Sequence, residues 1–266
     1  MKQFVIPQSP KDGGIYRLDA RDFHYLIRVR RMGIGDEVPV LFATGLSGLG
    51  SIVAIGDQWL DLEVSIPKMH DPDIIDTFHR QVPIRLLLGY PKGKKLEQSI
   101  RQSVELGVME IVPILCDHSV PEVNQFDWNR KSQRLGGIIG EAVQQSGGRV
   151  IPSLHPPMSL DDYLESCPLQ QDEIGIFFHE KPLDQKLLRE YLIPTPKLIC
   201  VFVGPEGGIS PREVELLGLG RFVPGYLGPR VLRCETAVVA ALAAVTILSL
   251  EGSIDTRQDH SSSLSS

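Results

Sequence analysis

The spacing of hydrophobic positions divides the chain into two regions. In the first, up to about residue 67, short apolar stretches are separated by turns that contain glycine. One helix is expected within this region, from Asp19 to Arg31, and it is followed by the helix-breaking residues Gly33 and Gly35. Short strands of this kind predict a small β-barrel, with strands at Phe4–Ile6, Glu37–Phe42, Ser51–Ile55 and Trp59–Ile66.

In the second region, from Val82 onward, strands alternate with helices, a pattern typical of helices packed on a mostly parallel sheet. Apolar side chains recur at Leu96, Ile100 and Val104, which predicts a helix that ends at Gly107. Another helix is expected over Arg134–Val143. The predicted strands are Ile84–Leu88, Val108–Leu115, Ile174–Phe178, Leu198–Val203 and Phe222–Leu227.

These patterns predict an α/β protein with two domains. The barrel domain is expected at residues 1–70, a linker at 71–81 and the sheet domain at 82–252. The linker mixes proline, histidine and acidic residues without a sustained period. Residues 253–266 form a serine-rich tail, which we expect to be disordered.

The run from Val238 to Leu250 is apolar on nearly all sides. It is shorter than the roughly 20 residues that a helix needs to cross a bilayer, so a buried helix is predicted. One face of a sheet cannot bury all sides of such a helix. Either a second copy of the chain covers it or it lies deep within its own chain, and we favour a homodimer.

The composition is that of an ordinary soluble globular protein, with 42% hydrophobic and 23% charged residues among 266. The first residues reach Pro7 before any long apolar stretch, unlike a signal peptide, so we expect a cytoplasmic protein with no membrane partner. The four cysteines are scattered, with no histidine at metal-ligand spacing. Neither a metal site nor a disulfide framework is predicted.

The distribution of basic residues matters more than their total. A formal net charge of -6 argues weakly against nucleic-acid binding, because phosphate contacts need lysine and arginine. Basic residues nevertheless outnumber acidic ones over residues 1–31, and a second basic group contains Lys92, Lys94, Lys95 and Arg101. Each group could instead be a solvated face with no ligand.

Residues 201–213 read as a buried strand, a loop with three glycines and the start of a helix. Ser210, Pro211 and Glu213 fit the N-cap, first-turn and capping-box positions of that helix. Ligands of open α/β sheets bind at the carboxyl ends of strands, where this loop falls. The loop has neither the GxGxxG pattern nor a Walker lysine, which disfavours dinucleotides and nucleoside triphosphates. The alternative interpretation of this loop is a simple connecting turn that binds no ligand.

Residues 226–236 repeat this design with a strand end, a Gly-Pro loop and a long helix that begins near Glu235. Arg230 and Arg233 occupy the junction between strand and helix, where they can meet an anion. Glu235 or Thr236 can cap the helix, so a purely structural role for Glu235 stays open.

With these motifs, the chain resembles the bacterial 16S ribosomal RNA uracil-N3 methyltransferases, which belong to the knotted SPOUT class. The resemblance runs from about residue 4 to 250. Its most specific parts are GPEGG at 204–208 and LGPRVLRxET at 227–236. Weaker support comes from ELGV at 105–108, EAxxQSG at 141–147 and the turn at 31–36.

The resemblance implies a PUA-like N-terminal barrel that helps to hold RNA, and a methyltransferase domain whose chain forms a trefoil knot. It also implies a homodimer and the cofactor S-adenosylmethionine. The family motifs and the basic groups of this chain together imply a set of RNA-binding residues, namely Arg28, Arg31, Lys92, Lys94, Arg101 and Arg149. The implied cofactor-binding residues are His179, Gly204, Pro205, Glu206, Gly207, Gly208, Leu227, Gly228, Val231, Leu232 and Arg233.

The implied reaction gives the charged residues definite roles. Uracil N3 is nucleophilic only as the anion, and a fixed arginine can stabilise that charge. We assign this catalytic role to Arg233, a phosphate contact to Arg230, and the orientation of one of these arginines to Glu235.

Three positions depart from the family pattern, namely Gln102, Gln144 and Gly148, and they concern the RNA side of the site. Two other functions therefore stay open. One is a related methyltransferase that acts on another nucleotide. The other is a non-catalytic RNA-binding or ribosome-assembly protein.

Overall fold

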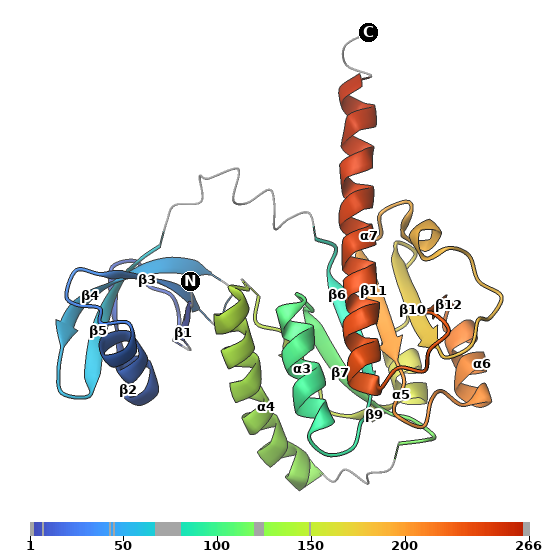
Figure 1. Ribbon diagram of the computed structural model, residues 1–266, viewed down its shortest axis with the longest axis horizontal. Coiled ribbons are helices and arrows are strands. Elements are labelled where there is room, and N and C mark those ends of the chain that lie inside the picture. The colour runs from blue at the N-terminus through green and yellow to red at the C-terminus, as the bar shows by residue number, and fades with distance from the viewer. Residues whose placement is uncertain are drawn as a thin grey trace. The chain divides into compact units, whose positions relative to one another are not determined.

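The chain forms two units in a computed structural model (Figure 1). The structure describes residues 3–6, 8–42, 44, 46–66, 81–119, 125–148 and 150–262, without the side chains of 125, 126 and 253–262. The first unit comprises Met1–Asp71 and Gly140–Ile151, and the second comprises Pro72–Ile139 and Pro152–Ser266. Nearly all of the predicted linker, and Arg149, lie outside the described residues.

A five-stranded sheet forms the first unit, in the order β1-β3-β4-β5-β2. Its first pair, β1 with β3, is parallel and the others are antiparallel. Strand β2 was not predicted, although its side chains alternate between the core and solvent, with Tyr16 and Leu18 buried. The strands are β1 Phe4–Ile6, β2 Gly14–Asp19, β3 Glu37–Phe42, β4 Ser47–Ile55 and β5 Trp59–Ser65.

The helix predicted from Asp19 to Arg31 is present as α1 (Ala20–Phe23) followed by one π-helical segment, η1 (His24–Val29). Phe23 and Leu26 pack into the core of the first unit. The π geometry, in which the Arg30 N–H donates to the Tyr25 carbonyl, could not be read from the spacing of apolar residues.

The second unit contains a parallel sheet in the order β12-β10-β11-β6-β7-β8, and β9 also pairs with β7. All five strands predicted here are present. The two-residue strands β8 and β9 are too short to give a sequence period. The strands are β6 Ile84–Gly89, β7 Glu110–Leu115, β8 Ser153–Leu154, β9 Met158–Ser159, β10 Glu173–His179, β11 Leu198–Val203 and β12 Phe222–Tyr226.

Helices cover both faces of this sheet. On one face, α3 (Lys95–Glu105) packs against α7 (Cys234–Ser262), and α7 packs against β11 and the 3-10 turn η2 (Leu188–Leu192). On the other face, α5 (Leu160–Ser166) and α6 (Pro211–Leu219) contribute to a core with alternate side chains of the central strands. The sheet is therefore buried on both sides, which explains its continuous apolar strands.

Helix α4 (Gln125–Ser146) is longer than predicted, and its residues are divided between the two units. Its last part, from Gly140, belongs to the first unit. There Arg21 pairs with Glu141, and the backbone N–H of Gln3 donates to the Gln144 carbonyl. The predicted division at residues 71–81 therefore omits a segment of the first unit.

Helix α7 buries Val238, Ala241, Leu242 and Val245, as the apolar run predicted. By length and composition alone, Cys234–Gly252 could cross a membrane, contrary to our estimate from the shorter run, although a helix that covers a core passes the same test. The helix also continues through Ser262, where we predicted a disordered tail. Each added residue of an existing helix gains a hydrogen bond without a new nucleus.

Candidate functional site

Three neighbouring strands of the second unit end in line with one another. Phe178 at the end of β10 is opposite Val203 of β11 on one side and Gly225 of β12 on the other. Because the strands are parallel, the loops that follow them leave from the same edge of the sheet. This edge is where open α/β sheets bind ligands.

A pocket of about 370 Å³ lies at this edge. We call Gly204–Ile209 the first loop and Leu227–Arg233 the second loop, and both contribute to its walls. Every cofactor-binding residue predicted from the sequence lines it, except Gly207. The lining residues are Lys95, Phe178, His179, Glu180, Val203, Gly204, Pro205, Glu206, Gly208, Ile209, Leu227, Gly228, Arg230, Val231, Leu232, Arg233, Cys234 and Ala237.

The first loop runs from β11 into α6, and the predicted capping box forms there. Ser210 Oγ accepts from the Glu213 N–H at 3.1 Å, while Glu213 Oε2 accepts from the Ser210 N–H at 2.8 Å. Gly208 has φ +77°, a conformation that favours glycine, and its N–H donates to the Pro205 carbonyl. The glycines therefore serve the shape of the loop as well as access to the pocket.

Strand β6 approaches the first loop so closely that Gly89 has no room for a side chain. A Cβ at Gly89 would lie 2.7 Å from the Gly204 carbonyl carbon and 2.6 Å from Pro205 Cδ. Sequence reasoning missed this role, because nothing near residue 89 indicates a neighbour more than a hundred positions later. The packing fixes the base of the first loop against the end of β6.

Lys95 and Glu206 form an ion pair at the pocket wall, with 2.9 Å between Nζ and Oε1. Partial burial raises the pKa of Glu206, but the hydrogen bond and charge of Lys95, together with backbone N–H donors, outweigh this effect and hold the pKa below its ordinary value. The same bond raises the pKa of Lys95. The sequence placed Lys95 only within a basic group, so its position in the pocket is a new finding.

The second loop connects β12 to α7 and carries both predicted arginines. Gly228 has φ +111°, and Arg230 and Arg233 are exposed while lining the pocket. Helix α7 begins at Cys234, and the Ala237 N–H donates to the Arg233 carbonyl at 2.8 Å. Burial raises the pKa of the Cys234 thiol to about 12, so this pocket residue is a neutral thiol at physiological pH.

The role predicted for Glu235 is the orientation of Arg230 or Arg233. It is not among the lining residues, and within the described part of the chain it forms no ion pair with Arg230 or Arg233. Its Oε2 is buried and has no hydrogen-bond partner among the described residues. Its role in orienting an arginine therefore stays a prediction.

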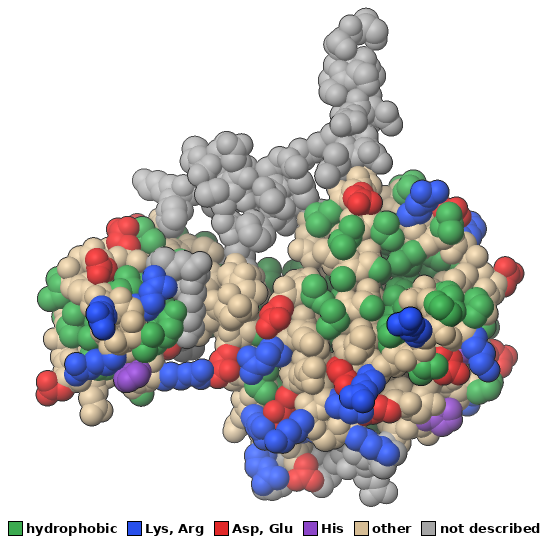
Figure 2. Space-filling view, in the orientation of Figure 1, with side chains coloured by type: hydrophobic (Ala, Val, Ile, Leu, Met, Phe, Trp, Pro, Cys, Tyr) green, Lys and Arg blue, Asp and Glu red, His purple; other side chains and the backbone are tan. Residues whose placement is uncertain are grey.

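The predicted RNA-binding residues are mostly exposed. In the first unit, Arg28 and Arg31 are exposed, and in the second unit Lys92 and Lys94 are exposed while Arg101 is half-buried on α3. Figure 2 shows Lys and Arg side chains over the region of α3 and α4, interspersed with Asp and Glu. No cluster of His, Cys, Asp or Glu that could hold a metal occurs among the described residues.

Two family models match the chain. The RNA methyltransferase domain matches residues 79–246, and the RNA methyltransferase PUA domain matches residues 18–65. The chain is also 26% identical over 246 residues to the ribosomal RNA small subunit methyltransferase E of Bacillus subtilis, covering 90% of this chain and 92% of that protein.

Solved structures agree with the fold. A methyltransferase from Legionella pneumophila, in complex with the bound cofactor SAM, has 25% identity and a TM-score of 0.74, covering 92% of this chain and 96% of that one. The ribosomal RNA small subunit methyltransferase E of Neisseria gonorrhoeae, bound to S-adenosyl methionine, has 22% identity and a TM-score of 0.76. The match covers 93% of this chain and 98% of that one.

Proposed function

Because the chain belongs to the RNA methyltransferase domain family, we propose that it transfers a methyl group from S-adenosylmethionine to N3 of a uracil in 16S ribosomal RNA. The observation that carries this proposal is the pocket at the ends of β10, β11 and β12, where both Gly-Pro loops meet. The name of the Bacillus subtilis relative supports the small-subunit RNA as substrate, and the resemblance of the two loops supports uracil N3. We also propose a cytoplasmic location, because ribosomal RNA is the substrate.

The pocket residues fit S-adenosylmethionine. The volume of about 370 Å³ lies within the range of roughly 300–1,000 Å³ that is usual for small-ligand sites. Phe178, Val203 and Ile209 provide apolar surface for an adenine ring, and the two loops bring backbone polar groups to the same space. A Cβ at Gly204 would lie 2.7 Å from Ile209 Cγ1, so a side chain there would displace the Ile209 side chain, which lines the pocket. When bound, the cofactor supplies an electrophilic methyl group on a sulfonium.

The arginines of the second loop carry the chemistry of the target base. Deprotonated uracil N3 is an anion, and Arg233 is a fixed positive charge at the pocket that stabilises it without exchanging a proton. Arg230, on the same loop, binds a phosphate of the RNA. The remaining RNA contacts come from Arg28 and Arg31 of the PUA-like unit and from the basic residues around α3.

We extend the proposal to the quaternary structure and to the path of the chain. Ile247 is 55% exposed on α7, and apolar residues such as Val239 and Ala243 beside it are only half-buried. A second copy of the chain packed on this face would cover them, giving a homodimer. A trefoil knot formed by the segments that carry the two loops is expected from the resemblance to SPOUT enzymes.

Two measurements test the proposed function. Titration calorimetry with S-adenosylmethionine should detect binding, and no heat at millimolar cofactor would contradict an enzyme and favour a non-catalytic RNA-binding protein. Mass mapping of 16S ribosomal RNA from a strain without the protein should show the loss of one N3-methyluracil. If all N3 methyl groups persist and another methyl group disappears, the enzyme acts on a different nucleotide.

A further inference from the structure

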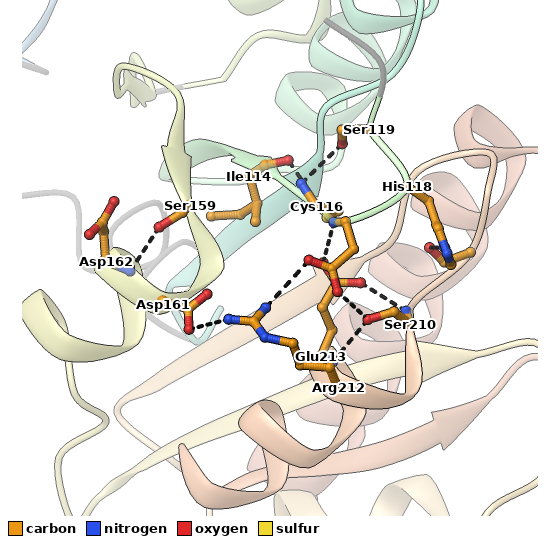
Figure 3. Close-up of polar contacts among 12 residues, drawn as sticks. Ile114, Cys116, His118, Ser119, Ser159, Asp161, Asp162, Ser210, Arg212 and Glu213 are labelled. Carbon is orange, nitrogen blue, oxygen red and sulfur yellow. Dashed lines mark hydrogen bonds and ion pairs between the residues drawn. The ribbon is translucent and has the colours of Figure 1, made fainter. Parts of the chain in front are cut away.

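The start of α6 is joined by hydrogen bonds to the loop that follows β7, of which the structure describes Cys116–Ser119. Glu213 is only 1% exposed, and its two carboxylate oxygens bind different segments. Oε2 accepts from the Ser210 N–H at 2.8 Å, and Oε1 accepts from the Asp117 N–H at 3.0 Å. One buried carboxylate therefore joins the end of the first loop to the loop after β7 (Figure 3).

Asp117 makes a second connection between the same segments. Ser210 Oγ donates to Asp117 Oδ2 at 2.6 Å, and Arg212 lies 3.3 Å from Asp117 Oδ1. Arg212 also reaches Asp161 at 2.6 Å, which joins α5 to the same network. The Ser210 hydroxyl is thus both the N-cap acceptor of α6 and a hydrogen-bond donor to the loop after β7.

His118 contacts the first loop along its middle. Its Nδ1 lies 3.3 Å from the Gly208 carbonyl oxygen. A Cβ at Gly207 would lie 2.6 Å from His118 Cβ, so the histidine packs directly on the loop backbone. This explains why Gly207, which does not line the pocket, is nevertheless a glycine: its side-chain space is occupied by His118 from outside.

A capping box alone does not account for this arrangement. The cap needs only Ser210 and Glu213 and can form at a helix end that faces solvent. Here the carboxylate is buried, which is unfavourable unless hydrogen bonds compensate, and one of its two backbone donors comes from Asp117. The network therefore secures the position of the loop after β7 against the first loop, beyond starting a helix.

We propose that Asp117, Ser210 and Glu213 are positioning residues that hold the first loop in the shape that receives the cofactor. None of the three lines the pocket, so they act through the shape of the loop rather than by contact with the cofactor. This inference rests on the proposed function for the identity of the cofactor. It requires that loss of the network weakens cofactor binding while the turnover number at saturating cofactor changes little.

The test compares Asp117→Ala with Asp117→Asn in the full-length protein. The alanine removes the acceptor for Ser210 Oγ, whereas asparagine keeps an oxygen there. We expect Asp117→Ala to raise the Kd for S-adenosylmethionine about tenfold and Asp117→Asn to stay within about threefold of the wild type, with kcat within about twofold for both. Hydrogen exchange should be faster at the first-loop amides in Asp117→Ala.

A matched control is available in α5. Ser159 is its N-cap and accepts from the Asp162 N–H at 3.0 Å, but among the described residues its hydroxyl forms no hydrogen bond with the first loop. Ser210→Ala and Ser159→Ala remove equivalent caps, so both should lower thermal stability. Only Ser210→Ala should weaken cofactor binding. Ser210→Ala also replaces Asp117→Ala as the test if the latter does not fold.

The outcomes separate this inference from the proposed function. If Asp117→Ala and Ser210→Ala bind the cofactor as the wild type does, or no more weakly than Ser159→Ala, the network is merely structural and the inference is wrong. If the wild type binds no S-adenosylmethionine, the proposed function fails. In that case, faster exchange confined to the first loop of Asp117→Ala still supports the positioning role, and unchanged exchange overturns it.

Discussion

Lys95 Nζ lies 2.9 Å from Glu206 Oε1, so the start of α3 and the first loop share a charged pair at the wall of the pocket. The Lys92 N–H also approaches the same oxygen, at 3.4 Å. Both partners remain partly exposed, and such pairs usually contribute little to overall stability. The pair holds the side chain of Glu206 in place at the wall of the pocket.

Glu206→Gln should remove the negative charge of the ion pair with Lys95, so its effect on stability should depend on pH. The pKa of Glu206 in the folded protein lies below 4.5 and that of Lys95 above 10.5. The stabilisation from the pair is thus present between these values and disappears as the pH falls through the folded pKa of Glu206 or rises through that of Lys95. Melting temperatures of both proteins at several pH values should differ near pH 7, and the difference should shrink as the pH falls below 4.5 through the lowered pKa of Glu206. A difference that stays constant over the whole acid range in which both proteins are folded would contradict the assignment.

Gly89→Ala should displace the base of the first loop. The added methyl would meet the backbone of Gly204 and the ring of Pro205, so we expect a loss of about 1–3 kcal/mol of unfolding free energy. Cofactor affinity should fall as well. Chemical denaturation and calorimetry measure the two effects. Gly136→Ala is the control, since nothing lies within 4 Å of a Cβ there, and in a helix it should stabilise by about 0.5–1 kcal/mol.

Arg233→Ala should remove turnover and leave the Kd for S-adenosylmethionine nearly unchanged, because we assign its side-chain charge to the target base, and any contact of Arg233 with the cofactor to its backbone. A loss of about 10²–10³ in kcat is expected from a single missing electrostatic contact. Single-turnover methylation of 16S RNA and calorimetry provide the two readouts. Lys197→Ala is the control, as Lys197 is exposed at the amino end of β11, away from the pocket. Equal losses in kcat and cofactor affinity would instead identify Arg233 as a cofactor ligand.

Ile247→Glu should prevent the homodimer that we propose from forming, because a charge on the exposed face of α7 would be buried on association. Sedimentation velocity at micromolar concentration measures the change. Leu219→Glu is the control, since Leu219 is 76% exposed at the end of α6, and it should leave the oligomeric state unaltered. A wild-type protein that sediments as a monomer at every concentration would rule out the dimer.

Much of the second unit could be predicted because its sheet is buried on both faces. The strand from Leu198 to Val203 is a continuous apolar run, and it has the predicted bounds. The start of α6 was specified by Ser210, Pro211 and Glu213 within four residues. In the first unit, β2 was missed although Arg17 and Asp19 alternate with its apolar residues, because the strand is short and its last residue, Asp19, was assigned to the start of a helix.

Some residues of the site could likewise be predicted from the sequence, and others could not. The two loops could be recognised because their glycine and proline residues are local signals for a turn between strand and helix. Lys95, Gly89 and His118 could not, because each acts on the first loop from a distant part of the chain. Their roles depend on the order of strands in the sheet, and a sequence period does not contain that order.

Because the residues of α4 are divided between the two units, a cut in the linker does not separate the units cleanly. A fragment ended at Asp71 would lack Gly140–Ile151, and with them the partners of Gln3 and Arg21. A fragment begun at Pro72 would carry that segment without the sheet to which it belongs. A cut in the linker would therefore leave the first unit incomplete and give the second a segment of helix that is not its own, so neither unit can be transferred intact to another protein in this way.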